Sequence, residues 1–183
     1  ASGNVTSFAY DLENRLVSEM NPIGITTTYT YTSTGRRATK TDGNGVATTY
    51  QYTVEGKLSR VDFPDGTFKE YRYNSKGNKI YEANAEVAQT YEYDDLNRVV
   101  SYTQANTGGI TKTLRYEFES NGNRSKMIDG EGGVTLYEYD RNNRLSKVTD
   151  PDGDVTRLEY DAAGRRSRLL LSNGVWAEYQ YDA

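Results

Sequence analysis

The sequence predicts an all-β fold in which tandem β-hairpin repeats of about 21 residues form a long antiparallel sheet that curls or spirals. Three observations lead to this prediction. Pairs of aromatic residues recur at a nearly constant spacing, two turn signals separate successive pairs, and the segments between the turns are short and rich in threonine and tyrosine.

The composition is unusual because tyrosine replaces much of the expected aliphatic core. The 183 residues include 17 Tyr, 4 Phe and 1 Trp, and the mean hydropathy is −0.85. The 22 basic and 26 acidic residues balance too evenly for an intrinsically disordered chain. Stability must therefore depend mainly on how the tyrosines are arranged.

Pairs of aromatic residues separated by one residue recur along the whole chain. Their starts are residues 8, 29, 50, 71, 91, 116, 137, 158 and 179, and Leu158 is the one aliphatic member. The spacings between starts are 21, 21, 21, 20, 25, 21, 21 and 21 residues. A fixed period indicates a repeat array, so we predict a single array of about nine repeats over residues 1–183. Both ends lie in repeat register, which indicates a fragment of a longer array.

The first turn signal follows each aromatic pair. The fourth residue after the second aromatic tolerates positive φ in every case: Asn14, Gly35, Gly56, Gly77, Asn97, Gly122, Asn143 and Gly164. An aspartate often follows the second aromatic directly, at Asp11, Asp94, Asp140, Asp161 and Asp182. Its carboxylate can accept hydrogen bonds from backbone amides two residues on, so we interpret these residues as turn caps and not as a catalytic group.

The second turn signal is a glycine fourteen residues after the second aromatic, usually preceded by Asn or Asp and by Pro or Gly. The positions are Gly24, Gly45, Gly66, Gly132, Gly153 and Gly174. Two turns per repeat leave two segments of about six residues, the usual length of a strand. Residues 82–88 lack the glycine and residues 104–110 carry four extra residues, so we expect irregular turns at both places.

Residues between the paired aromatics are mostly polar, which predicts one aromatic face and one polar face. We expect tyrosines of adjacent repeats to form rows of ring-to-ring contacts, each worth roughly a few tenths to 1 kcal/mol. A basic residue usually follows the turn position, at Arg15, Arg36, Lys57, Arg98, Arg144 and Arg165, with Asn78 and Asn123 as exceptions. These cations are expected to stack on a neighbouring tyrosine or to pair with a strand glutamate.

Four segments resemble the Tyr-Asp-x-x-Gly/Asn-Arg-Leu motif of Rhs/YD-repeat proteins: Tyr10–Leu16, Tyr93–Val99, Tyr139–Leu145 and Tyr160–Arg166. This family includes bacterial Rhs polymorphic toxins, cocoon-forming components of insecticidal toxin complexes, wall-associated proteins and animal teneurins. The resemblance covers essentially the whole chain. It implies a β-strip that spirals into a hollow shell, which in the toxin members encloses a toxic C-terminal domain until delivery. Complete shells need many more repeats, so this chain is expected to form part of a wall.

The resemblance also draws attention to a possible cleavage motif. Bacterial cores of the family tend to end in an Asp-Pro-x-Gly-containing motif linked to aspartyl self-cleavage, and Asp150-Pro151-Asp152-Gly153 matches it in part. The sequence continues from there into another repeat, Leu158 to Asp161. We therefore interpret these four residues as an ordinary turn between strands.

The composition excludes several function classes. The chain has no cysteine and no histidine, which removes thiolate chemistry, disulfides, the commonest general base and the commonest metal ligand. A net charge of −4 gives no attraction to nucleic acid, and no apolar run approaches the roughly 18 residues of a membrane span. Acidic turns at Asp129–Gly133 and Asp150–Asp154 offer oxygen atoms to Ca²⁺ but do not match an EF-hand loop. We assign no catalytic, cofactor-binding or metal-binding residue.

Two functional hypotheses remain. The preferred one is a non-enzymatic structural segment in the wall of a β-shell that encapsulates a toxin or effector domain in a large secreted or cell-surface bacterial protein, a localisation that follows from the resemblance alone. Its partners would be neighbouring repeats of the parent chain and the enclosed cargo, with self-association through exposed sheet edges. The alternative is a cell-surface adhesion or carbohydrate-binding module whose aromatic rows contact a glycan.

Overall fold

The computed structural model describes residues 5–182, and all regular secondary structure in that range is β-strand. The chain divides into two units, Ala1–Ala88 and Gln89–Ala183. The first unit contains β1 (Ser7–Tyr10), β2 (Leu16–Met20), β3 (Thr26–Tyr31), β4 (Arg37–Thr41), β5 (Ala47–Tyr52), β6 (Leu58–Asp62), β7 (Phe68–Tyr73) and β8 (Lys79–Ala83). The boundary falls within β9 (Val87–Tyr93). The second unit continues with β10 (Val99–Asn106), β11 (Thr111–Phe118), β12 (Arg124–Ile128), β13 (Val134–Tyr139), β14 (Leu145–Thr149), β15 (Val155–Tyr160), β16 (Arg166–Leu170) and β17 (Trp176–Glu178).

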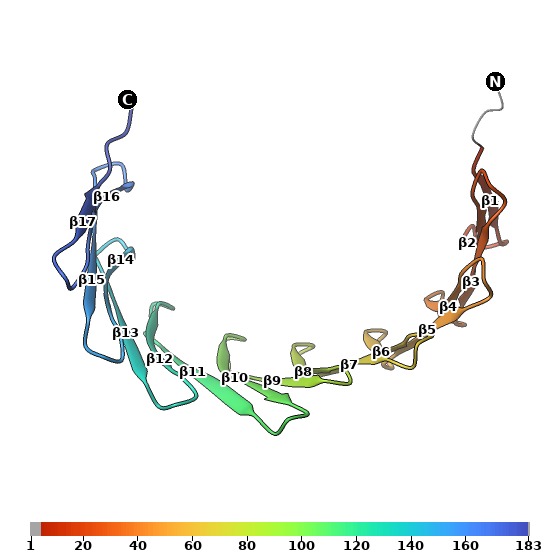
Figure 1. Cartoon of the computed structure of the whole chain (residues 1–183), viewed down its shortest axis with the longest axis horizontal. Helices are drawn as coiled ribbons and strands as arrows, with labels where there is room; N and C mark the ends of the chain where they lie inside the picture. Colours follow the sequence, from red (N-terminus) through yellow and green to blue (C-terminus); the bar gives the residue numbers. More distant parts are fainter. Residues whose placement is uncertain (1–4, 183) are drawn as a thin grey trace. The chain divides into compact units, whose positions relative to one another are not determined.

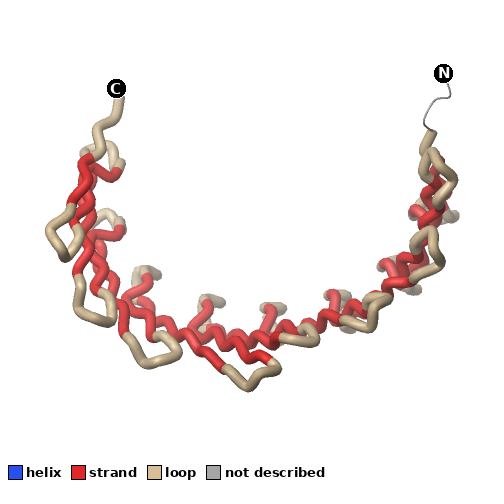
Figure 2. Tube along the Cα trace, viewed as in Figure 1, coloured by secondary structure: helices blue, strands red, loops and turns tan. Residues whose placement is uncertain are grey.

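Within each unit, strands pair with their neighbours in the sequence, and the pairs from β1 to β8 and from β10 to β17 are antiparallel. In the first unit this holds from β1 to β8. In the second unit β9 pairs with β10, and each later strand pairs with the next through to β17. Each unit is a single layer of hairpins, with loops and strands alternating along the chain (Figures 1 and 2). The prediction of an all-β fold built from tandem hairpin repeats is confirmed.

Side chains alternate between two chemically different faces. In β3, Tyr29 and Tyr31 are half-buried on one face, whereas Thr30 between them is exposed on the other. On the second face the hydroxyls of Thr30 and Thr39 lie 2.7 Å apart. In the second unit the corresponding pairs are ionic: Lys126 contacts Glu117 at 3.0 Å and Lys147 contacts Glu138 at 2.7 Å. The prediction of one aromatic and one polar face is confirmed.

Both turns of a repeat have the same backbone geometry. In the first, the Asp11 amide donates to the Arg15 carbonyl at 3.0 Å and the Asn14 amide donates to the Asp11 carbonyl at 3.0 Å. The second turn, Asn21–Ile25, has the matching bonds at 2.9 and 3.0 Å. This is a type I turn followed by a left-handed residue, which suits the twist of a hairpin. Prolines at 22, 64 and 151 all occupy the position after the first turn residue, where their fixed φ fits.

The residues predicted to adopt positive φ do so in both turns. The asparagines have φ near 60°: Asn14 (60), Asn97 (62) and Asn143 (59). The glycines of the first turn range from 78 to 95°, and those predicted for the second turn range from 80 to 90°. The irregular turns also differ as expected. Asn84 closes a shorter turn onto Val87 at 2.9 Å, whereas β10 and β11 each extend to 8 residues before a turn of the ordinary kind, with Gly109 at φ 81.

One β-bulge recurs at the same position in seven hairpins that begin with an aromatic pair. Ala9 pairs with Ser18 but Tyr10 pairs with Leu16, so Val17 is the extra residue. The same register shift precedes Tyr31, Tyr52, Tyr73, Phe118, Tyr139 and Tyr160. A bulge bends its strand and increases the local twist. Because it lies beside the first turn, it also sets the direction of the basic residue that ends that turn.

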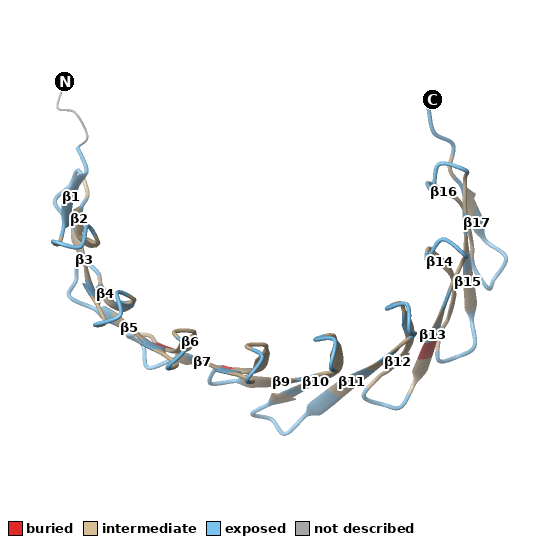
Figure 3. Cartoon of the chain, turned by 180° about the vertical axis from the view of Figure 1, so that it is seen from behind, coloured by how far each residue is buried: buried red, intermediate tan, exposed pale blue. Residues whose placement is uncertain are grey.

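The described residues form almost no buried core. In residues 5–182, only Val61, Ala83 and Thr135 fall in the buried class, at 6%, 6% and 8% exposure. Figure 3 shows these few buried positions in otherwise half-buried or exposed strands. Residues 5–182 also contain no helix long and apolar enough to cross a membrane. Stability must therefore come from contacts between neighbouring strands and turns.

Candidate functional site

The cation of the first turn is held by the carboxylate that caps the same turn. Asp11 Oδ1 accepts hydrogen bonds from the amides of Glu13 (3.0 Å) and Arg15 (2.9 Å), and Oδ2 accepts one from Arg15 Nε at 2.7 Å. The equivalent carboxylate-to-guanidinium distances are 2.7 Å at Asp94, 2.7 Å at Asp140 and 2.8 Å at Asp161. The predicted capping role is confirmed for these residues. The carboxylate also fixes the orientation of the guanidinium, which sequence reasoning did not assign to it.

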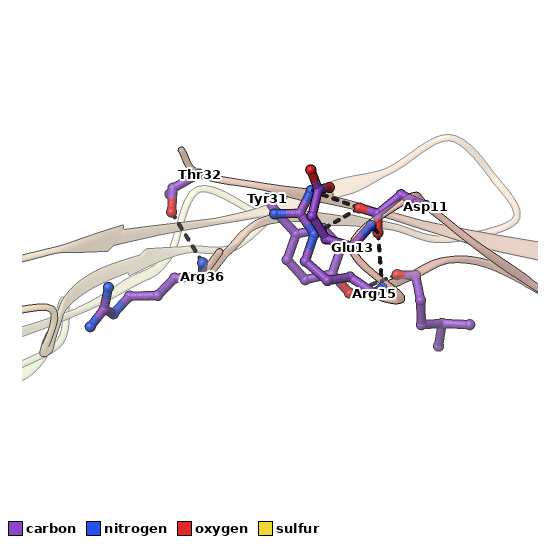
Figure 4. Close-up of polar contacts among 7 residues, drawn as sticks. Asp11, Glu13, Arg15, Tyr31, Thr32 and Arg36 are labelled. Atoms are coloured by element: carbon purple, nitrogen blue, oxygen red, sulfur yellow. Dashed lines mark hydrogen bonds and ion pairs between the residues drawn. The ribbon is translucent and has the colours of Figure 1, made fainter. Parts of the chain in front are cut away.

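The fixed cation lies over the second aromatic ring of the following repeat. Arg15 Cζ is 4.8 Å from the centre of the Tyr31 ring, and Arg144 Cζ is 4.5 Å from that of Tyr160. Asp11, Glu13 and Arg15 gather beside Tyr31 in Figure 4. The same contact occurs at Tyr52, Tyr73, Phe118 and Tyr181, at 5.9, 4.9, 4.4 and 4.6 Å. The predicted stacking of turn cations on tyrosine is thus confirmed, and each contact joins two repeats.

The hydroxyl of the stacked tyrosine completes the link. Tyr31 donates to the carbonyl of Leu16, the residue after Arg15, at 2.7 Å. The corresponding bonds of Tyr52, Tyr73, Tyr160 and Tyr181 measure 2.9, 2.9, 2.7 and 2.8 Å. We call this set the clamp: the turn cation of one repeat, the second aromatic of the next, and the carbonyl that follows the cation. In sequence the clamp is an offset of 16 residues from cation to tyrosine, as in Arg15 to Tyr31, and the longer connection between β10 and β11 lengthens it to 20 residues from Arg98 to Phe118.

The clamp persists where threonine replaces the capping aspartate. Thr32 Oγ1 accepts the Arg36 amide at 3.1 Å, and Arg36 Nε is then free to donate to the carbonyl of Gly56 at 2.8 Å. Lys57 donates in the same way to the Gly77 carbonyl. A cation in this place can therefore bind either its own turn or the next one, and in both cases it covers the neighbouring ring.

The predicted rows of ring-to-ring contacts are wrong for most repeats. Successive aromatic pairs lie two strands apart, roughly 10 Å, whereas aromatic rings interact at centroid distances of about 4.5–7 Å. Tyr91 and Tyr102, on adjacent strands, do meet at 5.3 Å. Elsewhere guanidinium groups fill the space between the aromatic pairs. They also lie over the first aromatic of a pair, as Arg37 does over Tyr29 at 4.6 Å. Arginine, not a second tyrosine, is the usual partner of each ring.

The acidic turns considered as calcium ligands are engaged with their own backbone. Asp150 Oδ1 accepts from the amides of Asp152 and Asp154 at 3.0 and 2.8 Å, and Asp129 Oδ1 accepts from Glu131 and Gly133 at 3.0 and 2.7 Å. In the part of the chain that the structure describes, no group of three or more acidic side chains is placed to hold a metal ion. The segment with the partial cleavage motif has the same turn geometry as Asn21–Ile25.

Acid is expected to weaken the clamp. Backbone amides first, and the adjacent guanidinium next, hold the pKa of Asp11, Asp94 and Asp140 below the ordinary value, while for Asp161 the Arg165 side chain is the main cause. Because the folded-state pKa is the lower one, this stabilisation is complete above the unfolded value of about 3.9 and is lost as pH falls through the folded pKa.

The expected result is a urea midpoint that changes little between about pH 7 and pH 5 and falls steeply below about pH 4. An Asp140→Asn/Asp161→Asn double variant should start from a lower midpoint and lose less of it on acidification, because it lacks two of the responsible carboxylates. If the urea midpoint of the double variant falls with acid as much as that of the parent chain, groups other than Asp140 and Asp161 cause the acid transition.

The tyrosine hydroxyl of the clamp can be tested by a reciprocal pair of substitutions. Tyr160→Phe removes the donor to the Leu145 carbonyl and should lower stability by about 1 kcal/mol. Phe118 occupies the same place below Arg98 but has no hydroxyl, so Phe118→Tyr should raise stability by up to about 1 kcal/mol by reaching the Val99 carbonyl. Urea unfolding measures both, and effects of the same sign would contradict this role.

Hairpins that repeat every 21 residues or so and are clamped to their neighbours define a tandem β-hairpin repeat protein. The family model described as RHS Repeat matches residues 10–47, 118–155 and 139–175, which is more than half of the chain. The chain belongs to the RHS repeat family. The resemblance drawn from the Tyr-Asp motifs is thereby confirmed.

One solved structure shares the fold at low sequence identity. The crystal structure of TcdB2-TccC3 without hypervariable C-terminal region is 18% identical, with a TM-score of 0.66 over 98% of this chain and 12% of that chain. The Photorhabdus luminescens Tc holotoxin pore, with a mutation in TccC3, is 16% identical, with a TM-score of 0.46 over 91% of this chain and 13% of that chain. The search of curated proteins gives no match. The chain spans a small fraction of the length of these structures.

Proposed function

We propose that this chain is a non-enzymatic wall segment of a β-shell that encapsulates a toxin or effector domain in a large secreted bacterial protein. The observation that carries the proposal is the clamp. Its carboxylate, guanidinium and phenol are the groups that an enzyme would use for acid–base chemistry or binding. In the clamps of residues 5–182 they are engaged in joining one repeat to the next.

Membership of the RHS repeat family and the fold shared with TcdB2-TccC3 support this proposal. The crystal structure named above lacks a hypervariable C-terminal region, which is the kind of segment that a shell would enclose. Since this chain covers 12% of that one, it would supply part of a wall. We further propose that residues 1–183 act as one array and that the sheet edges of β1 and β17 pair with neighbouring repeats or with a second copy.

The alternative, a carbohydrate-binding module, requires accessible ring faces on which a sugar can stack. In the clamps the ring faces of Tyr31 and Tyr160 are covered by guanidinium groups at 4.8 and 4.5 Å. A sugar would have to displace these cations. This geometry favours the wall over the glycan-binding hypothesis.

Encapsulation can be tested by limited proteolysis of the full parent protein. The domain that follows the repeats should resist digestion in the intact protein and become accessible when clamps are weakened by Arg144→Ala and Arg165→Ala together. The matched control is Arg157→Ala, because Arg157 makes no ion pair or ring contact within residues 5–182. A downstream domain that is digested equally fast in every variant would refute encapsulation, and a saturable signal on a glycan array would favour the alternative.

A further inference from the structure

One junction in the second unit has the clamp partners but no cation of its own. Asn123 stands 16 residues before Tyr139, at the offset that Arg144 has to Tyr160. The side-chain amides of Asn121 and Asn123 instead donate to Asn143 Oδ1 at 3.2 and 3.1 Å, which links the two turns through polar side chains. The connection between repeats is thus preserved without a group that covers the ring.

Three acceptors of a guanidinium are present at this junction. Tyr139 is half-buried on the aromatic face, and within the described chain no cation lies over its ring and its hydroxyl makes no hydrogen bond. Glu119 occupies the place of the capping aspartate, and its carboxylate forms no ion pair among residues 5–182. The Asp140 carbonyl accepts the Asn143 amide at 3.0 Å and retains a second lone pair. The equivalent Asp161 carbonyl accepts from Arg144 Nη1 at 3.5 Å.

At one junction of the first unit, the space between successive first turns is large enough for a side-chain terminus. At the junction of Lys57 and Tyr73 a hollow of about 210 Å³ remains even though lysine occupies the clamp. Asparagine is shorter than lysine or arginine, and at the Tyr139 junction its amide is turned toward Asn143. Asn123 thus leaves unfilled the place over the Tyr139 ring that the Arg144 guanidinium takes over Tyr160.

We propose that Tyr139, Glu119 and the Asp140 carbonyl form a binding site for an arginine side chain of a partner protein. Guanidinium fits better than ammonium because it can stack flat on the ring while its N–H groups donate within the guanidinium plane, parallel to the ring. Arg141 at the next turn tip and Arg124, stacked on Tyr116 at 4.6 Å, add positive charge nearby. These charges oppose long-range attraction of a cation, so a single arginine binds weakly.

The test is an NMR titration of the tyrosine-labelled chain with N-acetylarginine amide. Saturable upfield shifts are expected for the Tyr139 ring, assigned with a Tyr139→Leu variant, and none for Tyr160, whose face is covered by Arg144. N-acetylcitrulline amide, a neutral molecule of the same shape, should bind about tenfold more weakly. In Asn123→Arg the chain supplies its own guanidinium, and the Tyr139 response should disappear.

A reciprocal variant keeps the proposal testable if Asn123→Arg does not fold. Arg144→Asn converts the next junction into a copy of this one, so Tyr160 should begin to respond to the arginine probe. The proposal is overturned if all tyrosines shift alike, if citrulline and arginine amides act equally, or if the titration is unchanged in Asn123→Arg. The site does not depend on encapsulation, and these outcomes are independent of the proteolysis experiment.

Discussion

Replacing Gly56 with alanine is expected to cost about 3 kcal/mol of unfolding free energy. Gly56 has φ +82, a conformation that strains an alanine, and an added Cβ would lie 1.8 Å from Arg36 Nη2. The guanidinium can move away, but only by giving up its 2.8 Å bond to the Gly56 carbonyl and its place over Tyr52. The substitution therefore combines backbone strain with the loss of one clamp.

Gly45→Ala separates these two contributions. Gly45 has φ +80, nearly the same as Gly56, but nothing lies within 4 Å of the Cβ that alanine would add. Its expected cost is backbone strain alone, about 1–2 kcal/mol. Urea unfolding followed by tyrosine fluorescence gives both values. Equal losses in the two variants would show that the contact between Arg36 and the next turn contributes nothing.

The turns were predictable from sequence because their geometry restricts residue type. Only residues that tolerate positive φ fit the fourth turn position, and the repeats accordingly place Asn or Gly there, as at Asn14 and Gly35. The β-bulge was not predictable by the same reasoning. Its extra residue is Val17 in one repeat and Ser146 in another, and neither residue type marks a bulge. The bulge follows from the register between two strands, and that register depends on many residues of both strands together.

The contact between turn cation and aromatic ring was predictable from sequence, but the pairing of each cation with its ring was not. The turn cation and the aromatic pair are both visible in the sequence, and stacking between such groups is expected on chemical grounds. Which ring receives which cation depends on the pairing of two successive hairpins and on the bulge between them. The regular offset from Arg15 to Tyr31 was the available signal. The expectation of tyrosine rows failed because the two strands of each repeat place successive aromatic pairs roughly 10 Å apart, beyond the range of ring-to-ring contact.

Arg144→Ala is expected to lower stability by about 1–2 kcal/mol, because it removes the cover of the Tyr160 ring and leaves Asp140 without its guanidinium partner. Arg144→Lys should retain part of the stability that Arg144→Ala loses, since lysine can lie over the ring but lacks the planar fork that pairs with the carboxylate. The control is Arg157→Ala on the polar face. Arg157 lies opposite Lys147, so its removal should be neutral within about 0.5 kcal/mol.

A double-mutant cycle shows whether Arg144 acts through the next repeat. If it does, Arg144→Ala and Tyr160→Leu together should cost less than the sum of the two single changes, by about 1 kcal/mol, because each alone already breaks the same clamp. Additive losses would mean that the two residues stabilise their own hairpins separately. With almost no buried core in residues 5–182, coupling between neighbouring hairpins is what would allow them to unfold together. The cycle therefore measures directly the property that a wall requires.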